Sequence, residues 1–235
     1  MTNIIRAVDR HFNDFGWLKT YWLFSFSDYH DPHNLHLGAL RVFNDDIVEP
    51  GTGFATHPHE EMEIITIVLQ GEITHKDSMG NQTVIKAGDV QRMSAGTGLT
   101  HSEYNNGKEE VAFYQIWIEP GTTGLKPSYD QRSYESSLWR NTLLPLASGQ
   151  GLAGAVSFHT DASIYRCQLD SGKEVSHQCA EGRCTFLYLT AGQVTINGQT
   201  VSERDQVRVH GPEKLVVTTQ EQADFILIDI PECEE

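Results

Sequence analysis

Two short segments of the chain combine histidine and acidic residues at a spacing of two. The sequence THPHEEME contains His57 and His59, and the later sequence THSEYN contains His101 and Glu103. Successive side chains of a β-strand point to opposite faces, so residues i and i+2 share a face. If the two strands face each other across a barrel, three imidazoles and one carboxylate converge. The spacing therefore predicts a metal site with three nitrogen ligands and one oxygen ligand.

This set of ligands restricts the metal without choosing one. Imidazole and carboxylate groups bind Fe, Mn, Ni, Cu, Co or Zn ions, and the Irving–Williams order shows that affinity alone does not select among them. Four protein ligands leave one or two coordination positions open, as catalysis by a metal ion requires. We therefore expect one divalent transition metal per chain, bound by His57, His59, His101 and Glu103.

The rest of the sequence mostly predicts short β-strands. Apolar and β-branched runs such as EIITIVLQ and VAFYQIWI alternate with turn sequences such as SMGN and AGD. Short strands at a spacing of about 8–12 residues are typical of β-sandwiches and β-barrels. Helical periodicity is scarce, so we predict an all-β protein.

The second half of the chain repeats features of the first half. The pair His177-x-Cys179 stands between glycines in the same way as His57-x-His59, and VTINGQTVSERDQV is similar to ITHKDSMGNQTVIKAGDV. Such similarity indicates an internal duplication. We predict two domains, at residues 1–135 and 136–235. The second copy lacks a His-x-Glu pair, and two ligands do not hold a metal tightly, so we expect no metal there.

Composition and charge argue against several classes of protein. The 235 residues include 17 basic and 32 acidic side chains, a net charge of -15. Such a surface repels nucleic-acid phosphates and anionic membranes, so we expect neither as a direct partner. We see no signal peptide and no apolar run long enough to span a membrane, and we expect a cytoplasmic protein. Four cysteines are too few for a disulfide scaffold, and we expect ordinary buried thiols at Cys167, Cys179 and Cys184.

Three longer motifs are HPHEEMEIITIVLQGEITHKDSMGN, GDVQRMSAGTGLTHSEYN and YQIWIEP. Together they resemble the pirin family of the cupin superfamily, and in particular its short bacterial members. The resemblance implies a bicupin fold of two antiparallel jelly-roll β-barrels, with the second barrel degenerate. It also implies metal ligation by the two histidine-containing pairs and favours Fe(II). The chain departs from this branch at residues 22–26, which are WLFSF in place of HTFSF, so a nearby pocket or its packing differs.

Some short bacterial pirin-related proteins act as quercetin 2,3-dioxygenases, so the resemblance implies cleavage of a flavonol by dioxygen with loss of carbon monoxide. A divalent ion with three neutral imidazoles and one carboxylate has a net charge near +1, which favours an anionic oxygen such as a flavonol 3-hydroxylate. Glu103 would accept the proton of this hydroxyl, with Glu63 as the alternative. The flat substrate needs an apolar mouth, and the candidates are Phe54, Met62, Met93 and Phe113.

Two other interpretations of the function stay open. Animal pirins, which this chain also resembles, are described as iron-dependent, redox-responsive proteins that bind and regulate transcription factors. A change of iron from +2 to +3 would alter the charge beside a binding surface, so a protein partner is a second hypothesis. In the third, flavonol turnover is incidental and another enol-bearing aromatic compound is the natural substrate.

Several other polar residues are weaker candidates. Glu63 occupies the usual cupin glutamate position, but we expect it outside the metal ligands because Glu103 already supplies a carboxylate. Gln115 either orients a ligand by a hydrogen bond or is an ordinary strand residue. We expect a solvated loop for three histidines of the turn-like segment HDPHNLH, which are His30, His33 and His36.

Overall fold

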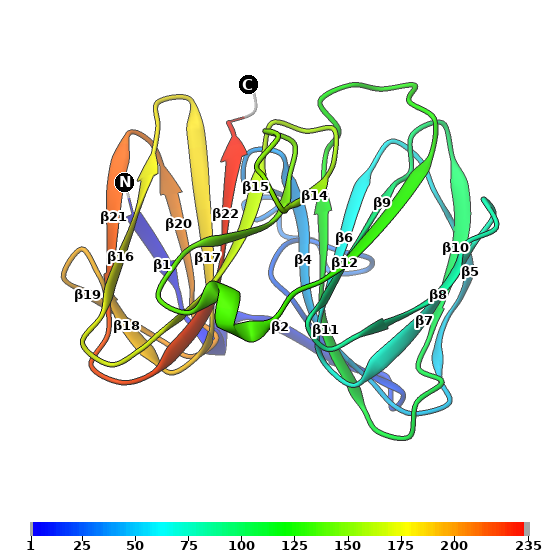
Figure 1. The fold of residues 1–235 in the computed structure, drawn as a ribbon, viewed down its shortest axis with the longest axis horizontal. Helices are drawn as coiled ribbons and strands as arrows, with labels where there is room; N and C mark the ends of the chain where they lie inside the picture. Colours follow the sequence, from blue (N-terminus) through cyan, green and yellow to red (C-terminus); the bar gives the residue numbers. More distant parts are fainter. Residues whose placement is uncertain (1, 233–235) are drawn as a thin grey trace.

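Residues 2–232 are described by the structure, a computed structural model, and they form two β-barrels that lie side by side (Figure 1). Each barrel combines a seven-stranded sheet with a four-stranded sheet, and nearly all strand pairs are antiparallel. The helical segments of these residues are two short 3-10 turns, η1 (Ala7–Asp9) and η2 (Ser136–Trp139). No helix among them is long and apolar enough to cross a membrane. The predicted all-β fold of two antiparallel barrels is confirmed.

The N-terminal barrel contains the predicted metal ligands. Its larger sheet has the order β12 (Ser128–Ser133), β9 (Asp89–Ser94), β6 (Glu63–Gln70), β11 (Val111–Ile118), β4 (Leu40–Val48), β3 (Leu18–Trp22) and β2 (His11–Asp14). Its smaller sheet has the order β5 (Gly53–His59), β10 (Leu99–Tyr104), β7 (Glu72–Asp77) and β8 (Gln82–Lys86).

The C-terminal barrel also combines one larger and one smaller sheet. The larger sheet has the order β1 (Thr2–Ile5), β20 (Gln206–His210), β17 (Arg183–Ala191), β22 (Ala223–Pro231), β15 (Ser163–Leu169), β13 (Leu144–Ser148) and β14 (Val156–Ser157). The smaller sheet has the order β16 (Glu174–Cys179), β21 (Glu213–Thr218), β18 (Gln193–Ile196) and β19 (Gln199–Ser202). Strand β1 pairs with β20 and so joins the sheet of C-terminal strands. The boundary between residues 135 and 136 stays a prediction.

Strand β6 shows why the larger sheets are apolar on both faces. Its sequence EIITIVLQ is rich in β-branched residues, which favour extended backbone. Ile65 and Ile67 belong to a core cluster that includes residues of both barrels, whereas Ile64 and Val68 belong to clusters within the N-terminal barrel. Side chains on one face of β6 therefore pack between the two barrels, and those on the other face pack in the interior of the N-terminal barrel.

Aromatic rings form the centre of the contact between the barrels, where β4, β11 and β17 meet. The ring centroid of Phe43 is 5.0 Å from that of Tyr114 and 5.1 Å from those of Phe186 and Tyr188. The Tyr188 hydroxyl also donates a 2.8 Å hydrogen bond to the buried carboxylate of Asp45. The two barrels thus share one continuous core.

Candidate functional site

The two histidine-containing pairs lie on neighbouring strands of the smaller N-terminal sheet. Strands β5 and β10 pair in antiparallel register, with His57 opposite His101 and His59 opposite Leu99. The expectation that these strands face each other across the barrel is therefore wrong. Adjacent strands are only about 4.8 Å apart, so side chains on the same face converge without crossing the barrel.

The expected alternation of side chains is present on β10. Leu99, His101 and Glu103 are buried, whereas Thr100 and Tyr104 are exposed. The strand register shifts between His101 and Glu103, as in a β-bulge. Bulges re-aim side chains next to functional sites, and this one separates the histidine from the carboxylate.

Three imidazoles meet at the inner face of β5 and β10. The ring centroids of His57, His59 and His101 are between 4.4 and 4.9 Å apart. The Nε2 atoms of His57 and His101 are 3.0 Å apart. The backbone carbonyl of Ala55 lies 2.7 Å from Nδ1 of His57 and accepts its hydrogen, which leaves the Nε2 lone pair of His57 directed at the centre of the group.

Glu103 is buried beside these imidazoles, and its carboxylate is oriented by Gln115. The Nε2 of Gln115 donates to Oε2 of Glu103 at 3.0 Å, and the Thr66 hydroxyl donates to Oε1 of Gln115 at 3.1 Å. Of the two roles considered for Gln115, the hydrogen bond agrees with orientation of a carboxylate that is a candidate ligand. The other oxygen, Oε1 of Glu103, is buried without a hydrogen-bond partner in residues 2–232. By distance Glu103 groups with His101 and His75, while His57, His59 and His101 form a group of their own.

Burial sets the charge state of this centre in the metal-free protein. It lowers the pKa of His101 to about 2 and that of His59 to about 4, with neighbouring imidazoles adding to the effect. Burial raises the pKa of Glu103 to about 7, although the hydrogen bond from Gln115 opposes this rise. His59 and His101 therefore present neutral nitrogen atoms with lone pairs at neutral pH, as metal ligation requires.

A cavity of about 520 Å³ has the three imidazoles and Glu103 in its wall. Aromatic side chains cover much of the remaining wall, namely Trp17, Trp22, Phe26, Phe54 and Trp117. Trp117 packs edge-on against His59 with ring centroids 4.9 Å apart, which ties the aromatic lining to the candidate ligands. A volume in the range of about 300–1,000 Å³ and an apolar wall are typical of small-molecule sites.

Polar groups form another part of the cavity wall, on strands β3 and β4. Asn44 Oδ1 is buried without a hydrogen-bond partner among the described residues, and the Thr20 hydroxyl lies beside the buried carboxylate of Asp46. Burial raises the pKa of Asp46 to about 8, and the nearby carboxylates of Asp45 and Glu103 add to this rise. These groups can hydrogen-bond to hydroxyl groups of a bound ligand.

Asp46→Asn is expected to change how the stability of the metal-free protein depends on pH. Between the ordinary pKa of 3.8 and the folded-state value of about 8, folded Asp46 holds a proton that the unfolded chain has lost. This group therefore lowers stability as pH rises through that window, by up to about 1.4 kcal/mol per pH unit. Asparagine does not titrate, so the variant should gain stability over the wild type from pH 5 to pH 8. Urea unfolding at several pH values tests this, and parallel pH profiles would contradict it.

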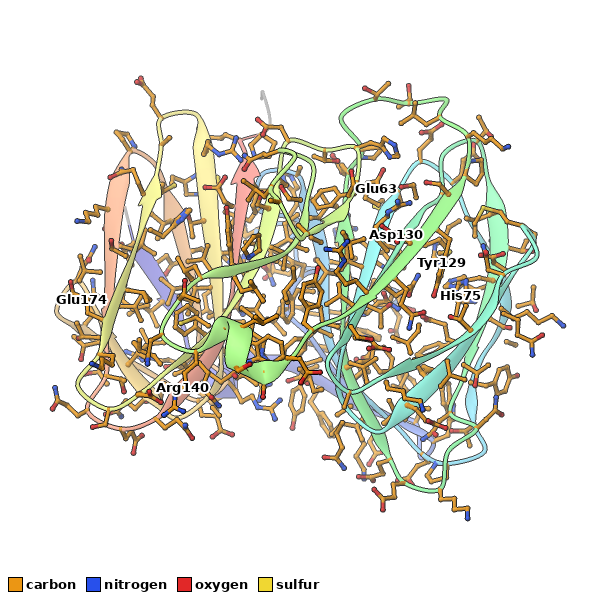
Figure 2. All side chains as sticks on the ribbon, in the orientation of Figure 1. Glu63, His75, Tyr129, Asp130, Arg140 and Glu174 are labelled. Carbon is orange, nitrogen blue, oxygen red and sulfur yellow. The ribbon has the colours of Figure 1, made fainter. Side chains whose placement is uncertain are left out.

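Glu63 lies outside the cluster of candidate ligands. Figure 2 labels Glu63, the first residue of β6. Its Oε2 accepts a 2.6 Å hydrogen bond from Ser94, and its Oε1 lies 3.0 Å from Nδ1 of His159, which follows β14. Glu63 is an even number of residues from His57 and His59, so unbroken alternation would direct it to the same face, but Glu61 interrupts the extended backbone between β5 and β6 with a φ of 45°. Alternation does not persist through such a break, and Glu63 joins the two halves of the chain instead.

Other predicted residues occupy different places. Phe54 lines the cavity, but Met62, Met93 and Phe113 pack in apolar clusters and do not line it.

On β16, Nε2 of His177 lies 3.0 Å from Asp229, and Cys179 is buried. The histidines of the segment before β4 are exposed, and these are His30, His33 and His36. The thiols of Cys167, Cys179 and Cys184 are buried, whereas Cys233 lies outside the described residues. Cys184, His210 and Glu232 form another group of potential ligands, with His210 and Glu232 exposed.

Sequence patterns missed several residues of the site. The cavity aromatics other than Phe54 carry no local signal, although the departure at residues 22–26 predicts an altered pocket or altered packing. Trp22 does line the cavity, and Leu23 is buried in the core between the barrels. His75 and Asp77, in THKD, have the same spacing as the predicted ligand pairs and could have been found by it.

Comparison with known proteins agrees with this architecture. A family model described as Pirin matches residues 5–118, and one described as Quercetinase C-terminal cupin domain matches residues 145–230. Quercetin 2,3-dioxygenase of Escherichia coli K12 is 38% identical over 232 residues, which cover 98% of this chain and 99% of that protein. The chain belongs to the pirin family. A pirin-like protein of Caulobacter vibrioides is 41% identical to this pirin over 92% of the chain and 94% of the relative.

The fold of this pirin is also similar to that of a solved structure. The crystal structure of the bacterial pirin YhhW from Escherichia coli in complex with nickel(II) has a TM-score of 0.93 and 37% identity, and the match covers 99% of this chain and 100% of that one. Both barrels are therefore of the cupin type, and the relatives support assignment of this pirin to the cupin enzymes.

Proposed function

We propose that this pirin is a metal-dependent dioxygenase that cleaves flavonols such as quercetin, at a single site held by His57, His59, His101 and Glu103. The observation that carries the proposal is the convergence of three imidazoles and a buried carboxylate in the wall of an aromatic cavity of about 520 Å³. The names of the relatives, among them the Escherichia coli quercetin 2,3-dioxygenase, support the same reaction.

The residues present fit a divalent ion. Two nitrogen ligands at about 2.1 Å from a metal and at right angles to each other are about 3.0 Å apart, and the Nε2 atoms of His57 and His101 are 3.0 Å apart. The unpartnered Oε1 of Glu103 offers a carboxylate oxygen to the same ion. Imidazole and carboxylate ligands with open positions suit Fe(II), which we propose as the native metal, and also suit the nickel of the Escherichia coli relative.

A bound ion would supply positive charge and an open position for the anionic oxygen of the substrate. The protein residues bind, orient and deprotonate the flavonol. The aromatic wall takes up the flat rings and excludes water, and Asp46 and Asn44 meet substrate hydroxyl groups. The Glu103 carboxylate accepts the proton of the 3-hydroxyl, and Gln115 holds this carboxylate in place for the transfer.

The deciding experiment loads the protein with Fe(II) under anaerobic conditions and adds dioxygen with quercetin, other flavonols or simpler aromatic enols. We expect one dioxygen consumed and one carbon monoxide released per flavonol, and no reaction from metal-free protein. Faster turnover of a simpler aromatic enol would show that this enol, and not the flavonol, is the better substrate. A fully loaded protein that consumes no dioxygen with any of these compounds would refute the dioxygenase proposal.

One metal ion per chain is expected, in the N-terminal barrel. The corresponding position of the C-terminal barrel has His177 engaged with Asp229 and no second histidine-containing pair. The double substitution His177→Ala and Cys179→Ala should therefore retain one equivalent of metal after dialysis, while the double substitution His57→Ala and His101→Ala, which leaves two protein ligands, should lose it. Elemental analysis of folded protein measures this. Two retained equivalents in the wild type would contradict the expectation and would direct attention to Cys184, His210 and Glu232.

A further inference from the structure

A second pair with a spacing of two, His75 and Asp77, lies on β7, directly beside β10. Asp77 is opposite His101 and His75 is opposite Glu103 in the strand register. Both side chains point into the barrel, with His75 0% and Asp77 8% exposed. Figure 2 shows His75 within this barrel next to Tyr129, whose ring centroid is 4.9 Å away. The proposed reaction gives this buried pair no role.

Asp77 is fixed as a hydrogen-bond acceptor. Its Oδ1 accepts the backbone N–H groups of Met79 at 2.9 Å and of Asn81 at 3.0 Å. Its Oδ2 accepts the side-chain amide of Asn81 at 2.8 Å and lies 3.0 Å from Nε2 of His75. Because the carboxylate can only accept, Nε2 of His75 carries the hydrogen, and Nδ1 of the neutral ring carries the lone pair.

His101 has the complementary requirement. Its Nε2 faces Nε2 of His57 at 3.0 Å, so Nδ1 points away from the cluster of imidazoles. A histidine that binds a metal through Nε2 keeps its hydrogen on Nδ1, and this N–H normally donates to a carboxylate, a carbonyl or water. Nδ1 of His101 is buried, and residues 2–232 provide no hydrogen-bond partner for it. Buried donors are rarely left in this state.

The acceptor within reach is Nδ1 of His75, which is also buried without a partner in the described chain. The two ring centroids are 5.4 Å apart, and a ring nitrogen of each lies within 4.8 Å of the other and of a carboxylate oxygen of Glu103. One water molecule that accepts from His101 and donates to His75 spans such a distance. A small rotation of one ring would instead bring the two nitrogen atoms into direct contact. The geometry points to a relay from Asp77 through His75 to His101, which fixes the hydrogen and the orientation of His101.

This inference rests on the proposed function, because it requires His101 to be a metal ligand. His75 and Asp77 are positioning residues that act through His101. An acceptor on Nδ1 makes the imidazole a stronger ligand and prevents its rotation, so the relay strengthens metal binding. A pair that only stabilised the barrel would leave the affinity for metal unchanged.

The test measures Ni²⁺ affinity by competition with a chelator, for the full chain and three variants. His75→Phe should lower the affinity about 10–100-fold, as loss of a hydrogen-bond partner of a metal ligand does. Asp77→Asn should lower the affinity as well. Tyr129→Phe is the matched control, because its hydroxyl bonds Thr83 and Gln131 at 2.9 Å beside the same ring but outside the relay. Its affinity should equal that of the wild type. Urea unfolding of each metal-free variant separates loss of stability from loss of affinity.

Imidazole nitrogen NMR of the zinc-loaded wild type gives a measurement that needs no variant. The relay predicts hydrogen on Nε2 of His75 and on Nδ1 of His101. Unchanged Ni²⁺ affinity in folded His75→Phe protein, or a hydrogen on Nδ1 of His75, would overturn the relay while the metal site stood. A wild-type protein that binds no metal would instead overturn the proposed function, and the relay with it.

Discussion

Glu103→Gln lowers flavonol turnover by about 10²–10⁴-fold at matched metal occupancy, the usual contribution of a general base. The substitution keeps the shape of the side chain and leaves an amide that Gln115 can still contact. It removes the negative charge and the basic oxygen at Oε1, which is buried without a partner in the described residues. Deprotonation of the substrate hydroxyl is therefore lost even where a metal is bound.

Metal binding should fall less than turnover in this variant. Three imidazoles remain, and three protein ligands suffice for many metal sites. We expect a loss of about 10–100-fold in affinity, similar to that caused by disturbance of groups around a metal. Metal content is measured by elemental analysis and turnover by dioxygen uptake, so that lost metal is not mistaken for lost catalysis.

Glu63→Gln is the matched control for Glu103→Gln. It makes the same chemical change at a buried glutamate whose partners are Ser94 and His159, away from the candidate ligands. We expect near-normal metal content and turnover, with some loss of stability from the weakened link between the halves of the chain. Wild-type turnover in Glu103→Gln, together with loss of metal and activity in Glu63→Gln, would show that Glu63 and not Glu103 is the carboxylate ligand.

The local part of the site could be predicted from sequence because it depends on one rule. Alternation along a strand places His57 with His59 and His101 with Glu103 on shared faces, and the structure has them so. The rule fails where the strand is interrupted. Glu61 has a positive φ, so the direction of Glu63 does not follow from its distance to His59.

The non-local part of the site depends on which strands become neighbours. Alternation does not distinguish strands that face each other from strands that pair, so the adjacency of β5 and β10 was missed. The cavity wall combines Trp22 of β3 and Asp46 of β4 with Trp117 of β11. These residues are far apart in sequence, and their side-chain types also suit an ordinary core, so only the sheet order selects them.

Sheet order also decides how the barrels depend on each other, and Phe43→Ala measures that dependence. Phe43 is fully buried, with ring centroids of Tyr114, Phe186 and Tyr188 between 5.0 and 5.1 Å away. Loss of a buried aromatic ring typically costs about 3–5 kcal/mol, because the cavity it leaves is only partly refilled. Since two of these three neighbours belong to the C-terminal barrel, we expect both barrels to lose stability together.

The measurement is chemical unfolding followed by circular dichroism and tryptophan fluorescence, with Phe12→Ala as the control. Phe12 lies on β2 and is 47% exposed, so the same substitution there should cost less than about 1 kcal/mol. We expect coincident transitions by both probes, shifted together in Phe43→Ala. If one barrel unfolded early while the other kept its wild-type stability, the barrels would be independent units, because a shared core cannot lose a central ring on one side alone.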